Sequence, residues 1–167
     1  RGVVAVLFHL GHWEALARAV AGVPGVEFAT IYQPLRNAGA DALVREWRSR
    51  TRVALISRHA ARSGGFREAT RRLRAGGVVG VLVDQHAGDH GLWTPFFSRL
   101  ASTTPLPAIL ARRTGAALVP VVCRETGKST PRWSVSYELP IRAEGRAEGE
   151  ILEEIHARLE EEIRRQP

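Results

Sequence analysis

The stretch VVAVLFHLGHWE, residues 3–14, decides the fold class, because it passes from an apolar run through a glycine turn into the start of a helix. Its first six residues are all apolar and half of them are valine, which is typical of a strand buried on both faces. Gly11 permits a sharp turn, and Glu14 falls in the first turn of the helix predicted for residues 13–21. A strand followed by a helix is the repeating unit of a parallel sheet covered by helices.

The same alternation continues through most of the chain. Further apolar runs predict strands at residues 26–31, 53–57, 78–83 and 117–123, and an alternating run predicts a half-exposed strand at 132–139. Helices are expected at residues 41–50, 66–75, 104–114 and, with an amphipathic pattern, 149–165. We therefore predict an α/β fold, a mainly parallel sheet of about six or seven strands covered by helices.

The length of 167 residues predicts a single domain over residues 1–167. The chain contains no methionine and begins directly before the first apolar run, so we expect a fragment of a longer protein. No apolar run reaches the roughly 20 residues that span a bilayer. Cys123 is the only cysteine, which excludes an intramolecular disulfide, and its apolar neighbours favour a buried structural thiol.

The formal net charge of +7 favours an acidic partner, such as nucleic acid, anionic lipid or an acidic carrier protein. The arginines are scattered, and no recognition helix, finger or base-stacking pattern accompanies them, so we do not expect nucleic-acid binding. The cluster of Arg71, Arg72 and Arg74 lies at a predicted helix end, where cations also interact favourably with the helix dipole.

Polar side chains follow four successive predicted strands. They are His9 after the first strand, Tyr32 and Arg36 after the second, Arg58 after the third, and Asp84 and Gln85 after the fourth. Sites in open parallel sheets form beyond the carboxyl ends of the strands, so we expect these residues to share one site.

Within this group, His9 and Glu14 are the candidate catalytic pair. We expect Glu14 to fold back to one imidazole nitrogen of His9, which would fix the tautomer and leave the other nitrogen free to accept a proton. No serine or cysteine nucleophile has an evident place beside them. The proton would then come from a substrate hydroxyl that attacks an activated acyl group directly.

Two other interpretations remain open. A metal-dependent hydrolase could be built from His9 with His12 and from His86 with His90, but the first pair lies at a strand end, where three-residue spacing does not put both rings on one helix face. A lipid-binding domain without turnover is the second interpretation, against which the intact pair of His9 and Glu14 argues. We expect neither a metal nor a cofactor.

The sequence blocks around these residues resemble the bacterial lipid A biosynthesis acyltransferases, the lauroyl and myristoyl transferase family, over nearly the whole chain. HLGHWE resembles the first block of the family, with His12 where asparagine is usual, and YQPLRN resembles its YRPLxN block, with Gln33 in place of arginine. ISRHA places Arg58 where the family has an arginine after its third strand.

The longest similar stretch is LVDQHAGDHGLWTPFFSRLASTTPLPAILARRTGAALVPV, residues 82–121. It resembles the family's succession of Asp-Gln, a glycine, a Pro-Phe-Phe turn, paired threonines and Gly-Ala before a strand, with Ser98 where glycine is usual. Its aromatic residues Trp93, Phe96 and Phe97 are expected either to line an acyl chain or membrane surface, or to anchor a turn in the core.

The resemblance implies transfer of a fatty acyl chain from acyl carrier protein or acyl-CoA to a hydroxyl of a membrane glycolipid, at the cytoplasmic face of the bacterial inner membrane. It implies His9 as general base, Glu14 as its orienting partner, and Arg58 as a ligand for phosphate. Asp84 and Gln85 would shape or polarise the site, and Tyr32 and Arg36 are further candidates for substrate binding. The family also has an N-terminal membrane segment and a C-terminal stretch that we expect this fragment to lack.

Overall fold

The computed structural model describes residues 1–21, 23–57, 64–127 and 132–165. Within these residues the main sheet has six strands in the order β3-β2-β4-β1-β7-β8. They are β1 (Val3–Leu7), β2 (Phe28–Tyr32), β3 (Ala54–Ser57), β4 (Val78–Leu82), β7 (Ala117–Glu125) and β8 (Trp133–Tyr137). The first five in spatial order are parallel, and only β8 pairs antiparallel, with β7. The predicted α/β fold is confirmed.

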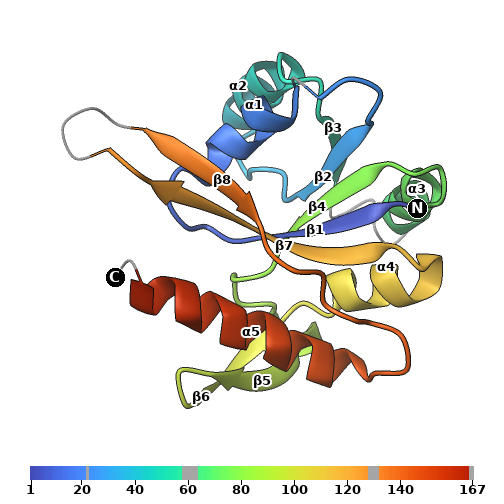
Figure 1. Ribbon diagram of the computed structural model, residues 1–167. Coiled ribbons are helices and arrows are strands. Elements are labelled where there is room, and N and C mark those ends of the chain that lie inside the picture. Colours follow the sequence, from blue (N-terminus) through green and yellow to red (C-terminus); the bar gives the residue numbers. More distant parts are fainter. Residues whose placement is uncertain (22, 58–63, 128–131, 166–167) are drawn as a thin grey trace.

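The helices cover the sheet on both faces (Figure 1). One face carries α1 (Leu16–Ala21) and α2 (Ala38–Ser49), and the other carries α3 (Gly65–Arg74), α4 (Leu106–Thr114) and α5 (Glu148–Arg165). In the part of the chain that the structure describes, no helix is both long enough and apolar enough to cross a bilayer.

The face under α3, α4 and α5 is densely packed. Val4 and Val6 of β1 and Val79 of β4 point to this side and are almost completely buried, as are Leu73 of α3 and Ile151 of α5. Burying each such side chain contributes about 1.5–3 kcal/mol, so this layer supplies most of the folding energy of the sheet. These residues alternate along each strand with residues that point to the other face.

The opposite face, under α1 and α2, is only partly filled. Its buried apolar cluster consists of Ala5, Leu16, Val121 and Cys123. The expectation of a buried Cys123 is confirmed, since its exposed fraction is 2%. Burial raises the pKa of the Cys123 thiol, which keeps the group protonated and unsuited to act as a nucleophile.

A hairpin of β5 (Leu92–Phe96) and β6 (Arg99–Thr103) was not predicted from the sequence, which indicated only a turn in this region. Its two-residue turn consists of Phe97 and Ser98, both with positive φ (45° and 62°). Such turns normally contain asparagine or glycine, so the usual hairpin signal is missing. Contacts with α5 stabilise the turn instead: the Phe97 N–H donates to Glu160 at 2.6 Å, and the Phe97 ring lies 5.0 Å from the Arg164 guanidinium.

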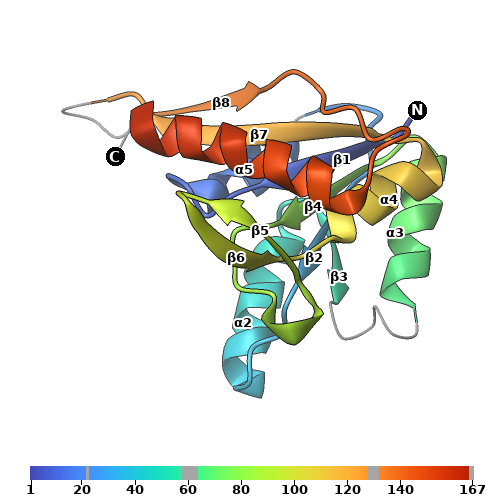
Figure 2. The ribbon, with the colours of Figure 1, turned by 90° about the horizontal axis from the view of Figure 1, so that it is seen from below.

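The hairpin packs against α5 through a buried histidine. His156 on α5 lies within hydrogen-bonding distance of Thr103 Oγ1 (2.9 Å) and the Pro95 carbonyl (2.9 Å), and its ring packs near Phe96. Of the three aromatic residues, Phe96 and Phe97 contact α5, although Phe97 remains 39% exposed, and Trp93 is 57% exposed. Figure 2 shows the hairpin below α5, crossing it obliquely.

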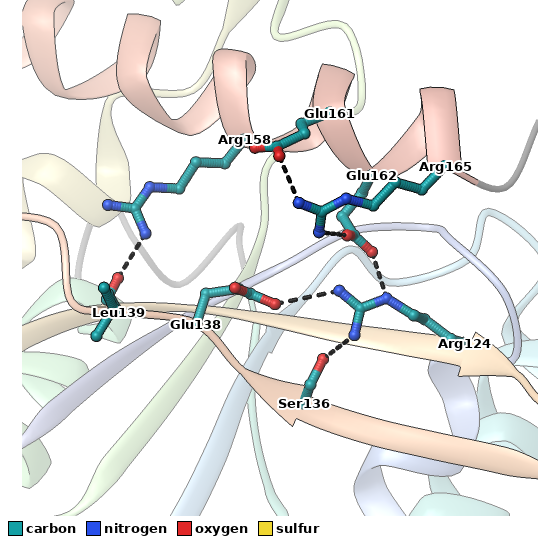
Figure 3. Close-up of polar contacts among 8 residues, drawn as sticks. All are labelled: Arg124, Ser136, Glu138, Leu139, Arg158, Glu161, Glu162 and Arg165. Carbon is teal, nitrogen blue, oxygen red and sulfur yellow. Dashed lines mark hydrogen bonds and ion pairs between the residues drawn. The ribbon is translucent and has the colours of Figure 1, made fainter.

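The C-terminal half of α5 is attached to β7 and β8 by charged side chains (Figure 3). Arg124 of β7 pairs with Glu162 of α5 at 2.5 Å and with Glu138, which follows β8, at 3.1 Å, and it also donates to the Ser136 hydroxyl. Glu162 accepts a second hydrogen bond from Arg165 at 2.8 Å. Because the Glu162 side chain is only 6% exposed, Arg124 and Arg165 compensate its lost hydration.

Candidate active site

The candidate site lies where the carboxyl ends of β1 and β4 meet. The two strands are parallel neighbours, paired from Val3–Val78 to Leu7–Leu82, so the residues that follow them come out side by side. After β1 the chain turns to α1 on one face, whereas after β4 it continues to the hairpin and then to α4 on the other face. Such a divergence opens a crevice at the strand ends, which is where α/β proteins bind ligands.

Asp84, which follows β4, holds His9 by two contacts. One carboxylate oxygen accepts the His9 backbone N–H at 2.7 Å, and the other lies 2.7 Å from His9 Nδ1. A carboxylate accepts hydrogen bonds, so Nδ1 carries the proton and Nε2 is left as the basic nitrogen. The Gln85 amide lies 3.4 Å from Nε2. Asp84 and Gln85 thus fix both the backbone and the ring orientation of His9.

The His9 ring contacts a tryptophan on one side and is partly exposed to solvent. The Trp13 ring meets the imidazole edge-on, with the centroids 4.8 Å apart. The His9 side chain is 27% exposed, so a substrate group can reach it. This arrangement of a carboxylate at Nδ1 of a partly exposed imidazole is suited to removing a proton from a bound hydroxyl.

The expected contact between Glu14 and His9 is corrected by the structure. Glu14 instead pairs with Arg48 of α2, with 2.5 Å between Oε1 and Nη2, and the carboxylate that contacts an imidazole nitrogen of His9 is that of Asp84, at Nδ1. The physical reason is charge: a permanently charged guanidinium binds a carboxylate more strongly than a neutral imidazole does. Arg48 also lies 6.0 Å from the Trp13 ring centroid, so the ion pair supports the residue that packs on His9.

Gly11 has the conformation that the sequence predicted. Its φ is +58°, and a Cβ at this position would lie 2.4 Å from the Cys123 carbonyl oxygen. Both the backbone angle and the close approach to β7 therefore require glycine. The tight turn brings Trp13 and Glu14 back over the end of β1.

A cavity of about 560 Å³ extends from His9 along the partly filled face of the sheet. Trp13, Glu14, Arg48 and Gln85 line it together with His9. Apolar side chains from the strands and from α1 and α2 form most of the rest of its wall, among them Leu7, Leu16, Val20, Phe28, Val44 and Leu82. The volume and the mainly apolar lining with a smaller number of polar groups are typical of a site for an organic ligand.

The other three predicted site residues, Tyr32, Arg36 and Arg58, differ in their positions. Tyr32 lines the cavity. Arg36 is exposed on the connection before α2, outside the cavity wall, and its neighbour Asn37 caps α2 by accepting the Ala40 N–H at 3.0 Å. Arg58 lies outside the described residues.

The metal interpretation finds no support among the residues of the four described ranges, where no three His, Cys, Asp or Glu side chains could hold an ion together. His12 instead packs edge-on against Trp133, and His86 packs against Trp93. In the arginine cluster at the end of α3, Arg71 pairs with Glu68, and Arg72 pairs with Glu68 and Glu27.

Sequence reasoning missed Arg48 and the orienting role of Asp84. Arg48 is one of several arginines in an amphipathic helix, and nothing in its spacing distinguishes it from its neighbours. The contact between Asp84 and His9 could have been predicted from the sequence. Each residue closely follows a buried strand, and equivalent positions after adjacent parallel strands lie close together.

The fold and this site define a class of protein: an α/β protein with a histidine held by a carboxylate beside a largely apolar cavity. The family model for bacterial lipid A biosynthesis acyltransferases matches residues 1–167, the whole chain. The chain therefore belongs to this family, and the family implies a transferase of acyl groups. No curated protein matched the chain.

Proposed function

We propose that the protein transfers a fatty acyl chain from a thioester, on acyl carrier protein or coenzyme A, to a hydroxyl group of a membrane glycolipid. The observation that carries the proposal is the His9–Asp84 pair beside a largely apolar cavity of about 560 Å³ that His9 lines. Family membership supports acyl transfer in lipid A biosynthesis, and the net charge of +7 suits an acidic carrier and an anionic membrane surface at the inner face of the bacterial inner membrane.

His9 is the general base in this proposal. Its Nε2 removes the proton of the acceptor hydroxyl while the hydroxyl oxygen attacks the thioester carbonyl carbon. Asp84 keeps the proton on Nδ1 and stabilises the imidazolium that forms. Collapse of the tetrahedral intermediate breaks the carbon–sulfur bond, and the sulfur takes the proton back from His9 Nε2. The products are an ester and a free thiol.

The other residues position the reactants. Gln85, beside Nε2, orients the attacking hydroxyl, and the Glu14–Arg48 pair holds Trp13 against His9. The acyl chain lies in the apolar cavity, where each buried methylene contributes about 0.8 kcal/mol. Binding the chain also holds the thioester carbon near His9, which lowers the entropic cost of the reaction.

The test is a comparison of His9→Ala and Asp84→Asn in the full-length enzyme. We expect each substitution to lower kcat for acyl transfer at least about a hundredfold, because the first removes the base and the second leaves the wrong nitrogen protonated. His90→Ala and Asp89→Asn are matched controls, since both residues are exposed in the connection after β4 and neither contributes to the cavity wall.

The controls should retain the parent rate, and circular dichroism should show the same fold for all four variants. Acyl transfer by His9→Ala at the parent rate would exclude His9 as the base. If Asp84→Asn retained the parent rate while Glu14→Gln lost it, the orienting carboxylate would be Glu14 and not Asp84.

A further inference from the structure

Gly80 occupies an unusual position in the middle of β4. The strand lies between β1 and β2 in the sheet, and Gly80 pairs in register with Ala5 on one side and Thr30 on the other. A glycine inside a strand is costly, because it loses more conformational freedom on folding and has no side chain to pack. Its backbone does not require glycine, since Gly80 is not among the residues with positive φ.

The space around Gly80 offers a reason for the glycine. A Cβ at this position would lie 2.9 Å from Leu7 Cδ1 and 3.5 Å from Thr30 Oγ1, and all three residues line the cavity. A side chain at position 80 would therefore project from the floor of the cavity into its interior. The nearest atom is the end of the flexible Leu7 side chain, which can rotate, so the protein can accommodate a larger residue at the expense of cavity space.

The position of Gly80 along the sheet places it away from His9. Ala5, Leu7 and His9 are every second residue and so point to the same face of the sheet. Ala5, the partner of Gly80, is four residues before His9, which at about 3.3 Å per residue places the Ala5–Gly80 pair roughly 13 Å from His9. Beyond Gly80, the paired residues Phe28 and Val78 line the same cavity with larger side chains. Gly80 and the Leu7 side chain that covers it thus lie between His9 and the bulky far end of the cavity.

We propose that Gly80 is a specificity-determining residue, which admits the distal part of the acyl chain and so sets the chain length that the enzyme accepts. The inference rests on the proposed acyl transfer. An acyl chain whose carbonyl group lies at His9 runs along this face of the sheet toward Gly80. Short chains end before Gly80, whereas longer chains need the space that a side chain would occupy.

The experiment compares Gly80→Ala and Gly80→Val with the parent enzyme, using acyl donors whose chains lengthen by two methylenes at a time. We expect the optimum to move to shorter chains, further for valine than for alanine. The relative kcat/KM for the longest accepted chain should fall about tenfold or more, the size of effect that one methylene has in a tight pocket. The relative kcat/KM for the shortest donors should fall least.

Gly149→Ala is the matched control, because a Cβ at Gly149 on α5 would meet nothing within 4 Å. This control should keep the parent profile. An unchanged profile in the Gly80 variants would overturn the inference, and so would an equal loss of rate for every chain length. Valine and alanine suit strands as well as or better than glycine does, so both variants should fold, which thermal unfolding checks.

A second measurement separates this inference from the proposed function. Free fatty acids of graded length compete with a fluorescent fatty acid for binding to the parent and Gly80→Val proteins. We expect the variant to lose affinity for long chains only. If the full-length parent transferred no acyl chain from any donor, the proposed function would fail, while this selective loss would still support the role of Gly80; equal affinities in both proteins would overturn that role.

Discussion

At the residue scale, the orientation of His9 depends on a neighbouring strand. Asp84 contacts both the backbone N–H and Nδ1 of His9, so one carboxylate fixes the position of the main chain and the rotation of the ring. A partner from the next turn, such as Glu14, would leave the ring dependent on the conformation of a connecting segment. Rigid strands position catalytic groups more closely than loops do.

Glu14 and Arg48 form a separate pair with a measurable coupling. The side chains are 28% and 16% exposed, and both line the cavity, so the pair is less hydrated than an ordinary surface ion pair. We expect a double-mutant cycle with Glu14→Gln and Arg48→Met to give a coupling free energy of about 1 kcal/mol or more for unfolding, as found for partners in one network.

The matched control for this cycle is the pair Glu46–Arg50, at the C-terminal end of α2, where Arg50 is the residue that follows the helix. Its side chains are 65% and 72% exposed, and pairs of this kind on helices couple by only about 0.3–0.5 kcal/mol. Unfolding by urea measures both cycles. Equal coupling energies would show that the Glu14–Arg48 pair is an ordinary surface contact.

At the element scale, the sequence predicted the strands and helices well where local patterns determine them. The second strand begins at Phe28 and not at residue 26, because Val26 is apolar but 37% exposed. The second helix begins at Ala38, three residues earlier than expected, because Asn37 caps it. The latter signal is readable, since asparagine is among the preferred N-cap residues.

The β5–β6 hairpin and the contact between His9 and Asp84 could not be predicted from such local patterns. The turn at Phe97 and Ser98 depends on Glu160 and Arg164 of α5, which lie far along the chain. The convergence of residues on one sheet edge was predictable from the parallel topology, and His9, Asp84 and Gln85 do lie together. Arg48 binds Glu14 and so keeps this carboxylate away from His9. No spacing in the sequence reveals that Arg48 lies there.

The attachment of α5 to β7 makes the stability dependent on pH. The hydrogen bond from Arg124 holds the pKa of Glu162 below its ordinary value of 4.5, against the opposing effect of burial. The folded state binds this proton less readily than the unfolded state, so the stabilisation is present above pH 4.5 and is lost as the pH falls through the lowered pKa. Acid should therefore loosen the C-terminal half of α5.

We expect Glu162→Gln to lower the free energy of unfolding at pH 7 by about 2 kcal/mol, as for the loss of a hydrogen bond to a charged group. The variant should lose less additional stability than the parent when the pH is lowered below 4.5. Thermal unfolding over a pH series measures both effects, with Glu153→Gln on an exposed position of α5 as control. Parallel pH profiles for the parent and Glu162→Gln would contradict this role of Glu162.

At the scale of the whole molecule, the two faces of the sheet differ in how densely they are packed. The face under α3, α4 and α5 holds the dense core, whereas the face under α1 and α2 has the small cluster and the cavity. Parallel sheets are usually covered and filled on both faces, so a hollow face is a departure that a ligand can exploit. Stability and binding are thus separated by a single layer of strands, with His9 and Asp84 at its edge.

The net charge of +7 is a property of the whole chain, and in the proposed function it would act on the encounter with an acidic donor. Raising the salt concentration from about 0.1 M to about 1 M shortens the screening length from about 10 Å to about 3 Å, which removes long-range attraction. For a donor on an acidic carrier protein we expect KM to rise about tenfold or more, while kcat stays nearly constant because the cavity chemistry is unchanged. The control is a small uncharged acyl thioester, whose KM should change little. Steady-state rates with both donors measure the difference; equal salt dependence would mean that the excess of positive charge does not recruit the carrier.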